Sequence, residues 1–336
     1  MEKYLIEALQ LHQRVPVVDT HAHFLLVGYY LRKRFERRHR PPLLWNPLRN
    51  TVDLVRLREG RISCSTFTIY VPPPPFRIRA WTAALRILDF RDRTLERNRQ
   101  EILPAIKAED IRQAHAQGKL AALTAIEGGH VIGGKIERLA VLRERGVRLF
   151  TLTHFIANRI SDAHLGPSVH GGLSRFGREV VRECQKLGMV VDLAHASEKA
   201  FYQALDLLER PPVVTHACLR RHGRSQRYIT DDQVRAVARA GGGLGVLMCP
   251  WYQGRFSLLG SLDEAAEVYA RMAELVGPEH LMLGTDMDGF TWLPRGMRHA
   301  GDLPRLTAKL LKRGFSQKEI SGILGENFLR ILSRWE

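Results

Sequence analysis

LAALTAIEG (120–128) is a short apolar run that stops at a carboxylate, Glu127, and the same pattern recurs along the chain. Such runs, mostly five to eight residues long and rich in Leu and β-branched residues, are typical of strands buried on both faces of a parallel sheet. The other runs are VPVVDTHAHF (15–24), CSTFTIYV (64–71), VRLFTLTH (147–154), MVVDLAH (189–195), PPVVTH (211–216), GGLGVLM (242–248) and HLMLGTD (280–286).

Helical patterns separate these runs. IERLAVLRERG (136–146) and FGREVVRECQKLG (176–188) place apolar residues at helical spacing and end at glycine, and Thr230 is placed to cap QVRAVARAG (233–241). Eight strand–helix alternations predict a (β/α)8 TIM barrel, with an open doubly wound sheet as the alternative. No GxGxxG follows the first run, which argues against a dinucleotide site. We expect one domain over residues 1–336, with loop insertions at about 25–63 and 72–85.

Composition excludes several classes of protein. The 336 residues are 45% hydrophobic and 26% charged, as in ordinary soluble globular proteins. There is no apolar run of about 20 residues, so we expect no membrane span. The four cysteines show no CxxC spacing, which argues against a disulfide framework and a cysteine zinc site. The N-terminus lacks the pattern of a secretory signal, and we expect a cytoplasmic protein.

The net charge of +16 requires that a nucleic-acid partner be considered. Arginine is concentrated in LRKRFERRHR (31–40) and FRDRTLERNR (90–99). The second stretch interleaves acids and indicates a solvated helix face, whereas the first precedes two prolines and predicts a loop or short helix. We favour exposed surfaces over a nucleic-acid groove, and no nucleic-acid partner is expected.

Polar side chains stand at the ends of most predicted strands. In a (β/α)8 barrel the active site lies at the carboxyl ends of the strands, so these side chains are expected to meet. Burying imidazoles without partners costs several kilocalories per mole, and a shared metal would supply a partner to several at once. The residues are His21, His23, Glu127, His154, His195, His216 and Asp286.

Imidazole and carboxylate ligands suit Zn, Mn, Ni or Fe(II). His21 and His23 are two residues apart on a strand and point to one face. Glu127 can bridge two ions, and two ions about 3.5–4 Å apart can hold a shared hydroxide for hydrolysis. Asp286 competes with Asp288, because alternation puts both on one face; we prefer Asp286.

Structural explanations exist for the same residues. The histidines could be hydrogen-bonded core residues, Glu127 could cap the following turn, and His154 could be a structural support. Among the remaining histidines, His130 and His164 are expected nearest the pocket.

From about residue 15 to 332 the chain resembles the renal (membrane) dipeptidase family of zinc metallopeptidases, within the amidohydrolase-type hydrolases. The matching stretches follow the family order. They are IEGGH (126–130), TLTH (151–154), GGLSRFGREVV (171–181), VVDLAHAS (190–197), VVTHACLRRHGRSQRYITDDQ (213–233), LGTDMDG (283–289) and GENFLRIL (325–332).

The resemblance implies two zinc ions that share Glu127. The first would take His21 and residue 23, and the second His195 and His216. It also implies that His154 contacts the substrate carbonyl, that Arg227 binds the substrate carboxylate, and that Asp286 transfers a proton and recognises the substrate amine.

Two departures from the family pattern stand out. The family usually has His-x-Asp on the first strand, whereas this chain has His21-Ala22-His23, so a neutral ligand replaces an anion. After the seventh strand the family tends to have an Asn-Phe-Tyr type stretch, and here Leu247-Met248-Cys249-Pro250 stands instead. We expect neither the family's secretory leader nor its glycolipid anchor.

The predicted function is a metal-dependent dipeptidase that acts through a hydroxide bridging two divalent ions, with Zn²⁺ expected. The expected partner is a small peptide substrate, with a homodimer as an option. A first alternative is hydrolysis of another small amide, an N-acyl amino acid or a lactam, at the same site. A second is a metal-free binding protein or nucleic-acid partner on a barrel that has lost catalysis.

Overall fold

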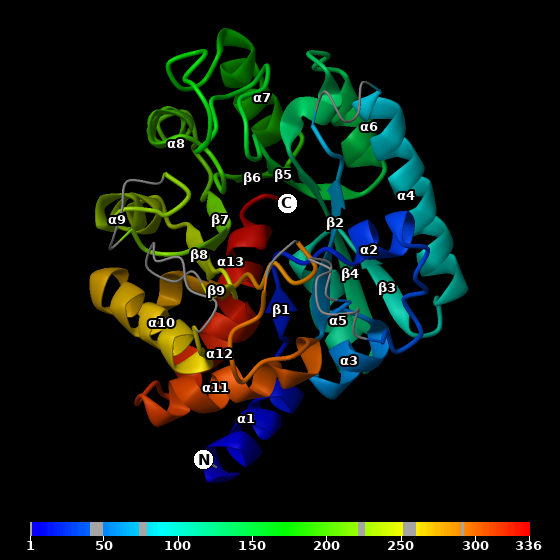
Figure 1. Ribbon diagram of the computed structural model, residues 1–336, viewed down its shortest axis with the longest axis vertical. Helices are drawn as coiled ribbons and strands as arrows, with labels where there is room; N and C mark the ends of the chain where they lie inside the picture. Colours follow the sequence, from blue (N-terminus) through cyan, green and yellow to red (C-terminus); the bar gives the residue numbers. More distant parts are fainter. Residues whose placement is uncertain (1, 41–49, 74–78, 221–225, 251–259, 290–291) are drawn as a thin grey trace.

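Parallel strands form a closed barrel in the computed structural model, with the helices arranged around it (Figure 1). The structure describes residues 2–40, 50–73, 79–220, 226–250, 260–289 and 292–336. The strands are β1 (Val18–Asp19), β2 (Cys64–Tyr70), β3 (Ile102–Ala105), β4 (Leu120–Glu127), β5 (Val147–Thr151), β6 (Val190–Asp192), β7 (Val213–Ala217), β8 (Gly243–Val246) and β9 (Leu281–Leu283).

Within these described residues the sheet order is β2-β1-β9-β8-β7-β6-β5-β4-β3, and β2 also pairs with β4. This parallel pairing runs from Cys64 opposite Ala121 to Tyr70 opposite Glu127 and closes the barrel. The predicted (β/α)8 TIM barrel is therefore confirmed: every predicted strand is present, although several are shorter than their apolar runs.

The strand β3 was not predicted. It pairs only with the first half of β4, from Ile102 opposite Leu120 to Ala105 opposite Leu123. The strand β5 takes over beside the second half of β4, from Thr124 onward. Pro104 has no N–H for a second ladder, which suits a strand with one neighbour. Four residues that include a proline carry too weak a pattern to be recognised in sequence.

The predicted helices are present as α6, α7 and α9. Ser174 begins α7 by accepting a hydrogen bond from the Gly177 N–H, and Thr230 caps α9 as expected. The helices are α1 (Glu2–Arg14), α2 (Phe24–Tyr30), α3 (Leu54–Glu59), α4 (Ala80–Arg97), α5 (Ala108–Ala116), α6 (Arg138–Glu144), α7 (Arg175–Lys186), α8 (Glu198–Leu205), α9 (Asp231–Arg239), α10 (Leu262–Val276), α11 (Leu303–Lys312), α12 (Gln317–Ser321) and α13 (Asn327–Ser333).

The expected insertions contain helices. The segment 25–63 includes most of α2 and all of α3, and its residues 41–49 lie outside the described part of the chain. The segment 72–85 ends in the first turns of α4, and its residues 74–78 are likewise outside that part. The arginine-rich stretch 31–40 is a loop, whereas 90–99 lies mostly on α4. Of the helices that the structure describes, none is both long and apolar enough to cross a membrane.

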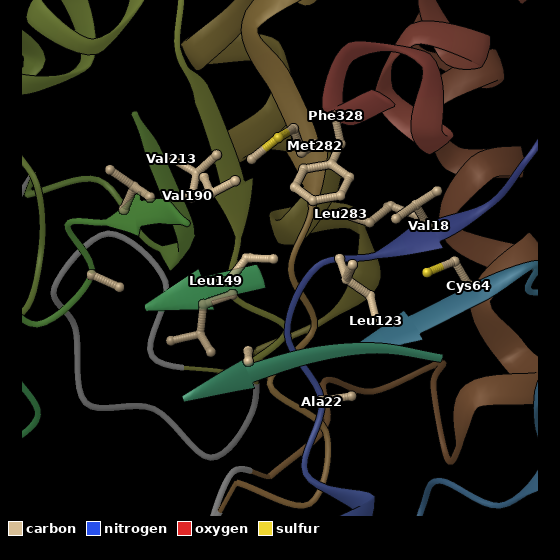
Figure 2. Close-up of a cluster of buried hydrophobic side chains, with 14 of the residues drawn as sticks. Val18, Ala22, Cys64, Leu123, Leu149, Val190, Val213, Met282, Leu283 and Phe328 are labelled. Carbon is tan, nitrogen blue, oxygen red and sulfur yellow. The ribbon is translucent and has the colours of Figure 1, made fainter. Parts of the chain in front are cut away.

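The core fills the barrel and the layer between the strands and helices. Figure 2 draws Val18, Leu149 and Val213 as members of one cluster of buried strand side chains, with Phe328 of α13 beside Met282. All five are almost fully buried. Burial of each such side chain stabilises the fold by about 1.5–3 kcal/mol. The rigid barrel that results holds the loops at the carboxyl ends of its strands.

Candidate metal centre and active site

The polar residues predicted at the strand ends lie in or just beyond the strands. Glu127 is the last residue of β4, and His216 is the next to last of β7. The remaining predicted residues follow their strands within a few positions: His21 and His23 follow β1, His154 follows β5, His195 follows β6 and Asp286 follows β9. The barrel therefore brings six strand ends to one mouth.

The side chains of these residues converge on Glu127. Its Oε1 lies 3.2 Å from Nε2 of His21, 3.2 Å from Nε2 of His195 and 3.6 Å from Nε2 of His216. Its Oε2 lies 3.3 Å from Nε2 of His23. The central position expected of Glu127 is thus present in the structure.

The ring nitrogens also meet in pairs. Nε2 of His21 lies 3.1 Å from Nε2 of His23, and Nε2 of His195 lies 2.8 Å from Nε2 of His216. Two nitrogens that ligate one zinc at about 2.0–2.1 Å in tetrahedral geometry are about 3.4 Å apart. Each pair, with an oxygen of Glu127, has the donor types and approximate spacing that a divalent ion requires. The residues present therefore fit a metal centre.

Electrostatics favour a cation in this cluster. Burial, with added effects of Arg227 and His154, holds the pKa of His195 well below its usual range, so its imidazole is neutral. Burial lowers the pKa of His23, but the carboxylates of Glu127 and Asp286 outweigh it and raise that pKa to about 10. Burial would raise the pKa of Glu127, yet the surrounding histidines hold it well below its usual range. The anionic centre therefore attracts positive charge.

A hydrogen-bond chain through Thr215 to Asp192 orients the ring of His216. The Thr215 hydroxyl donates to Asp192 Oδ2 at 2.7 Å and lies 2.9 Å from Nδ1 of His216. Because the hydroxyl of Thr215 donates its proton to the carboxylate, the hydroxyl oxygen accepts from Nδ1–H of His216. The Nε2 atom is then unprotonated, and its lone pair faces the cluster. Asp192 is buried and also accepts from the N–H groups of Ala194 and Thr215.

The loops after β1 and β9 are bonded to each other. Asp19 accepts from the Thr285 hydroxyl at 2.6 Å and from its N–H at 2.9 Å. The Asp286 N–H donates to the His21 carbonyl at 2.8 Å, and the His23 N–H donates to the Met287 carbonyl at 2.8 Å. These bonds fix the two histidines relative to Asp286.

Asp286, and not Asp288, faces the cluster. Its Oδ1 lies 3.2 Å from Nε2 of His23. Asp288 instead accepts from the N–H groups of Thr51 and Val52 and anchors that loop. The expectation that both point to one face is wrong, because these aspartates have φ of 54° and 62° and the segment is not extended.

Left-handed backbone occurs at two residues of the cluster. His195 has φ of 65° and Asp286 has φ of 54°. Residues other than glycine adopt this region rarely, and it persists where the surroundings enforce it, often at functional sites. The His164 N–H donates to the His195 carbonyl at 2.9 Å, which helps to hold the His195 loop.

A cavity of about 430 Å³ opens over the cluster. Arg227 lines it, and its guanidinium donates to the His216 carbonyl at 3.3 Å. Of the two remaining histidines expected nearest the pocket, His164 lines this cavity and His130 does not. The full lining comprises His23, Tyr70, Glu127, His154, Phe155, His164, Leu165, His195, Arg227, Tyr228, Leu247, Cys249, Asp286 and Gly289. This volume suits a small molecule.

Three residues of the site were missed in the sequence. Tyr70 lines the cavity, and its ring lies 4.8 Å from that of His154. Asp19 and Asp192 are buried and accept hydrogen bonds from the hydroxyls of Thr285 and Thr215. Both aspartates follow a Val-Val pair shortly before a predicted ligand, in VVDTHAH and VVDLAH, and this repeated pattern could have identified them. Tyr70 carries no comparable signal.

Sequence comparison places these residues in a known family. The family model for the membrane dipeptidases, peptidase family M19, matches residues 5–336. "Dipeptidase tcpJ" of Claviceps purpurea is 30% identical over 294 residues, which cover 85% of this chain and 69% of that protein. "Dipeptidase verJ" of Clonostachys rogersoniana is 30% identical over 352 residues, covering 100% and 88% respectively.

Solved structures agree in fold. The probable dipeptidase PvdM of Pseudomonas aeruginosa superposes with a TM-score of 0.90 at 20% identity, covering 99% of this chain and 98% of its own. A metallopeptidase of Rhodobacter sphaeroides, liganded with a phosphinate mimic of the dipeptide L-Ala-D-Ala, superposes with a TM-score of 0.85 at 23% identity. The match covers 96% of this chain and 99% of that one. Dipeptidase AC, a metallopeptidase of family M19, superposes with a TM-score of 0.84 at 26% identity, covering 95% of this chain and 98% of its own. The chain therefore belongs to the membrane dipeptidase family, peptidase family M19, and is a metallopeptidase of that family.

Proposed function

We propose that this metallopeptidase hydrolyses the peptide bond of dipeptides at a centre of two divalent metal ions, with Zn²⁺ as the expected metal. His21, His23 and Glu127 would hold the first ion. Glu127, His195 and His216 would hold the second. The convergence of four ligand nitrogens on the two oxygens of Glu127 carries the proposal.

The two ions would supply an acidified water, shared between them as hydroxide, and would polarise the scissile carbonyl. The protein provides the proton path. Asp286 would accept the proton of the attacking water at a carboxylate oxygen and pass it to the leaving amine nitrogen. Its Oδ1 lies 3.2 Å from Nε2 of His23, which would be a ligand of the first ion.

His154 is proposed to stabilise the developing oxyanion. Burial lowers its pKa to about 4, so the imidazole is neutral at pH 7. Its Nε2 lies 3.7 Å from Oε1 of Glu127 and its ring lines the cavity. A neutral ring with its proton on Nε2 can donate to an oxygen on which charge develops.

Arg227 is proposed to bind the carboxylate of the substrate. Guanidinium and carboxylate form two parallel hydrogen bonds, and such a pair would select short substrates with a free carboxyl terminus. The dipeptide mimic bound by the Rhodobacter sphaeroides protein supports a substrate of this size. In this chain the cavity of about 430 Å³ is lined by Arg227 and by three of the proposed ligands, His23, Glu127 and His195.

A hydrolysis screen tests the proposal. The purified protein should cleave dipeptides, lose activity after chelation and regain it when Zn²⁺ is added back. Arg227→Met should raise the KM for dipeptides at least tenfold, about 1.4 kcal/mol, because the carboxylate contact is lost. Unchanged dipeptide turnover by Arg227→Met would show that Arg227 does not bind the carboxylate.

A second substrate class is favoured by the loop after β8. Leu247 and Cys249 of this loop line the cavity, in a segment that departs from the family pattern. N-acyl amino acids and lactams therefore belong in the same screen. Their turnover without dipeptide cleavage would replace the proposed substrate, and a metal-free protein that hydrolyses nothing would remove the proposal altogether.

A further inference from the structure

A second cavity, of about 580 Å³, adjoins the active-site cavity. The two share His154 and Phe155 in their linings. The second cavity is bounded by the loops that follow β2, β4 and β5, so it lies on one side of the barrel mouth. The exposed fraction of Phe155 is 41%, so one of the two shared residues also reaches solvent.

This second cavity is lined by positive charge. Arg79, Arg138 and Arg159 contribute to it, and its described lining contains no Asp or Glu. Three arginines line one space, and an anion inside it would be attracted by their like charges. The cavity is therefore complementary to an acidic group.

Arg138 is held in place by its neighbours. Its guanidinium donates to the Ile132 carbonyl at 3.0 Å and lies 4.7 Å above the ring of Trp81. Gly133 has φ of 58°, and a Cβ there would come within 2.9 Å of the Arg138 guanidinium. The glycine thus permits both the turn and the close approach of the arginine.

Arg159 lies on a loop that is stabilised by hydrogen bonds of the neighbouring Asn158. Asn158 donates to the Leu152 carbonyl at 2.9 Å and accepts from the Ile160 N–H at 2.7 Å. The Arg159 guanidinium packs on Gly134, where a Cβ would lie 2.8 Å from one of its nitrogens. The backbone that carries Arg159 is therefore held by Asn158, while the guanidinium of Arg138 is held by its own hydrogen bond.

The proposed carboxylate-binding Arg227 lies on another part of the barrel mouth, beyond β7. The loops of the second cavity follow β2, β4 and β5. A dipeptide whose carboxyl end is bound at Arg227, with its scissile bond over Glu127, would direct its amino-terminal residue away from β7. That residue would then face His154 and Phe155, which line both cavities.

We propose that this cavity is a specificity site for a carboxylate on the side chain of the substrate's amino-terminal residue, with Arg138 and Arg159 as its recognition groups. The proposal rests on the proposed dipeptidase function. Guanidinium groups recognise carboxylates by planar paired hydrogen bonds, and an isosteric amide cannot replace the charge. The enzyme therefore prefers Glu-Ala to Gln-Ala.

The experiment compares kcat/KM for Glu-Ala, Gln-Ala and Ala-Ala. The wild-type protein should favour Glu-Ala over Gln-Ala at least fivefold. Arg159→Gln and Arg138→Gln should each lower this ratio at least threefold, mainly through the KM for Glu-Ala, and should leave Ala-Ala within twofold of wild type. Arg159→Gln is the cleaner variant, because Arg138 also bonds the backbone at Ile132.

Arg175→Gln is the matched control. The side chain of Arg175 is 96% exposed on α7 and pairs with Glu179, so the substitution removes the same charge at the surface. It should preserve the wild-type ratio. A Glu-Ala to Gln-Ala ratio near one in the wild type, or an equal change in Arg175→Gln, would overturn the specificity site.

Failure of the dipeptidase function is a separate outcome. If none of the three dipeptides is hydrolysed, the same protein can be titrated calorimetrically with Glu-Ala and Gln-Ala. Tighter binding of Glu-Ala that Arg159→Gln abolishes would support the anion site without the reaction. Equal binding of the two peptides would overturn it.

Discussion

A histidine binds a metal through Nε2 only while that nitrogen keeps its lone pair, so the partner of Nδ1 decides whether the residue can act as a ligand. In this chain the partner of His216 is the Thr215 hydroxyl, which in turn donates to Asp192. The buried carboxylate thus selects the tautomer of a proposed ligand without touching it.

Thr215→Val tests this arrangement. Valine keeps the shape but removes the hydroxyl, so the Nδ1 proton of His216 loses its acceptor in a buried site. We expect metal affinity to fall about 10–100-fold and the free energy of unfolding to fall by about 1–3 kcal/mol. Competition with a chromogenic chelator measures the affinity, and thermal unfolding measures the stability.

Thr215→Ser keeps the hydroxyl and is the matched control for Thr215→Val. It should retain metal affinity close to wild type. If the serine and valine variants lose metal equally, the hydroxyl has no orienting role.

At the scale of the residue, the sequence predicted the members of the cluster, because a polar side chain at the end of a buried strand is visible in one dimension. It left Asp286 and Asp288 in competition with Asp286 preferred, and the structure places Asp286 beside His23. That choice follows from the positive φ values of both aspartates, which the residue types do not reveal.

Among the elements, β7, β8 and β9 approach so closely that two of their neighbouring positions must be glycine. A Cβ at Gly245 or Gly284 would overlap the Thr215 carbonyl. Gly284 directly follows β9 and precedes the loop that carries Asp286. Packing between strands is therefore coupled to the position of a proposed catalytic group.

Gly284→Ala should reduce the free energy of unfolding by about 3 kcal/mol or more, because backbone must move to admit the methyl group. Gly118→Ala is the control: no atom lies within 4 Å of the Cβ it would add, and only its φ of 65° opposes the change. That substitution should cost about 1 kcal/mol. Chemical denaturation measures both, and equal losses would contradict the close approach at β9.

The helix α1 is joined to α11 through a buried imidazole. His12 contacts the Gly60 carbonyl through Nδ1 and the Thr307 hydroxyl through Nε2, each at 2.8 Å. Burial lowers the pKa of His12 to about 4, from 6.5 in the unfolded chain. Between these pH values the unfolded state binds the proton and the folded state does not. Stability therefore falls as the pH drops from 6.5 to 4, by about 3 kcal/mol from this residue.

His12→Gln should remove this part of the pH dependence, so that the free energy of unfolding declines less steeply over the same range. His170→Gln removes an exposed imidazole and should keep the wild-type slope. Denaturant titrations at several pH values compare the three proteins. Identical slopes for wild type and His12→Gln would show that the buried imidazole does not titrate on unfolding.

Elements were predicted where their pattern is long. The helices α6, α7 and α9 have apolar spacing, caps or terminal glycines, and the long strand β4 is almost wholly apolar. The strand β3 and the helices α2 and α3 were missed, because they are short and take their order from packing on the barrel rather than from local pattern.

For the whole molecule, the count of eight strand–helix repeats favoured a closed barrel over an open sheet, because eight right-handed repeats close into a barrel. The second cavity could not be predicted, because its arginines come from segments that are distant in sequence and meet only in the closed fold. Surface pairs such as Arg112 with Glu326 and Arg145 with Asp92 offset individual arginines, and the net charge of +16 is the excess that remains after every acid is counted.

The central claim is that two cations share Glu127 at the mouth of this barrel. Anomalous X-ray diffraction from crystals grown with Zn²⁺ tests it most directly. We predict two peaks on either side of the Glu127 carboxylate, one beside His21 and His23 and the other beside His195 and His216. Absence of any peak at Glu127, with zinc bound elsewhere or not at all, would contradict the account.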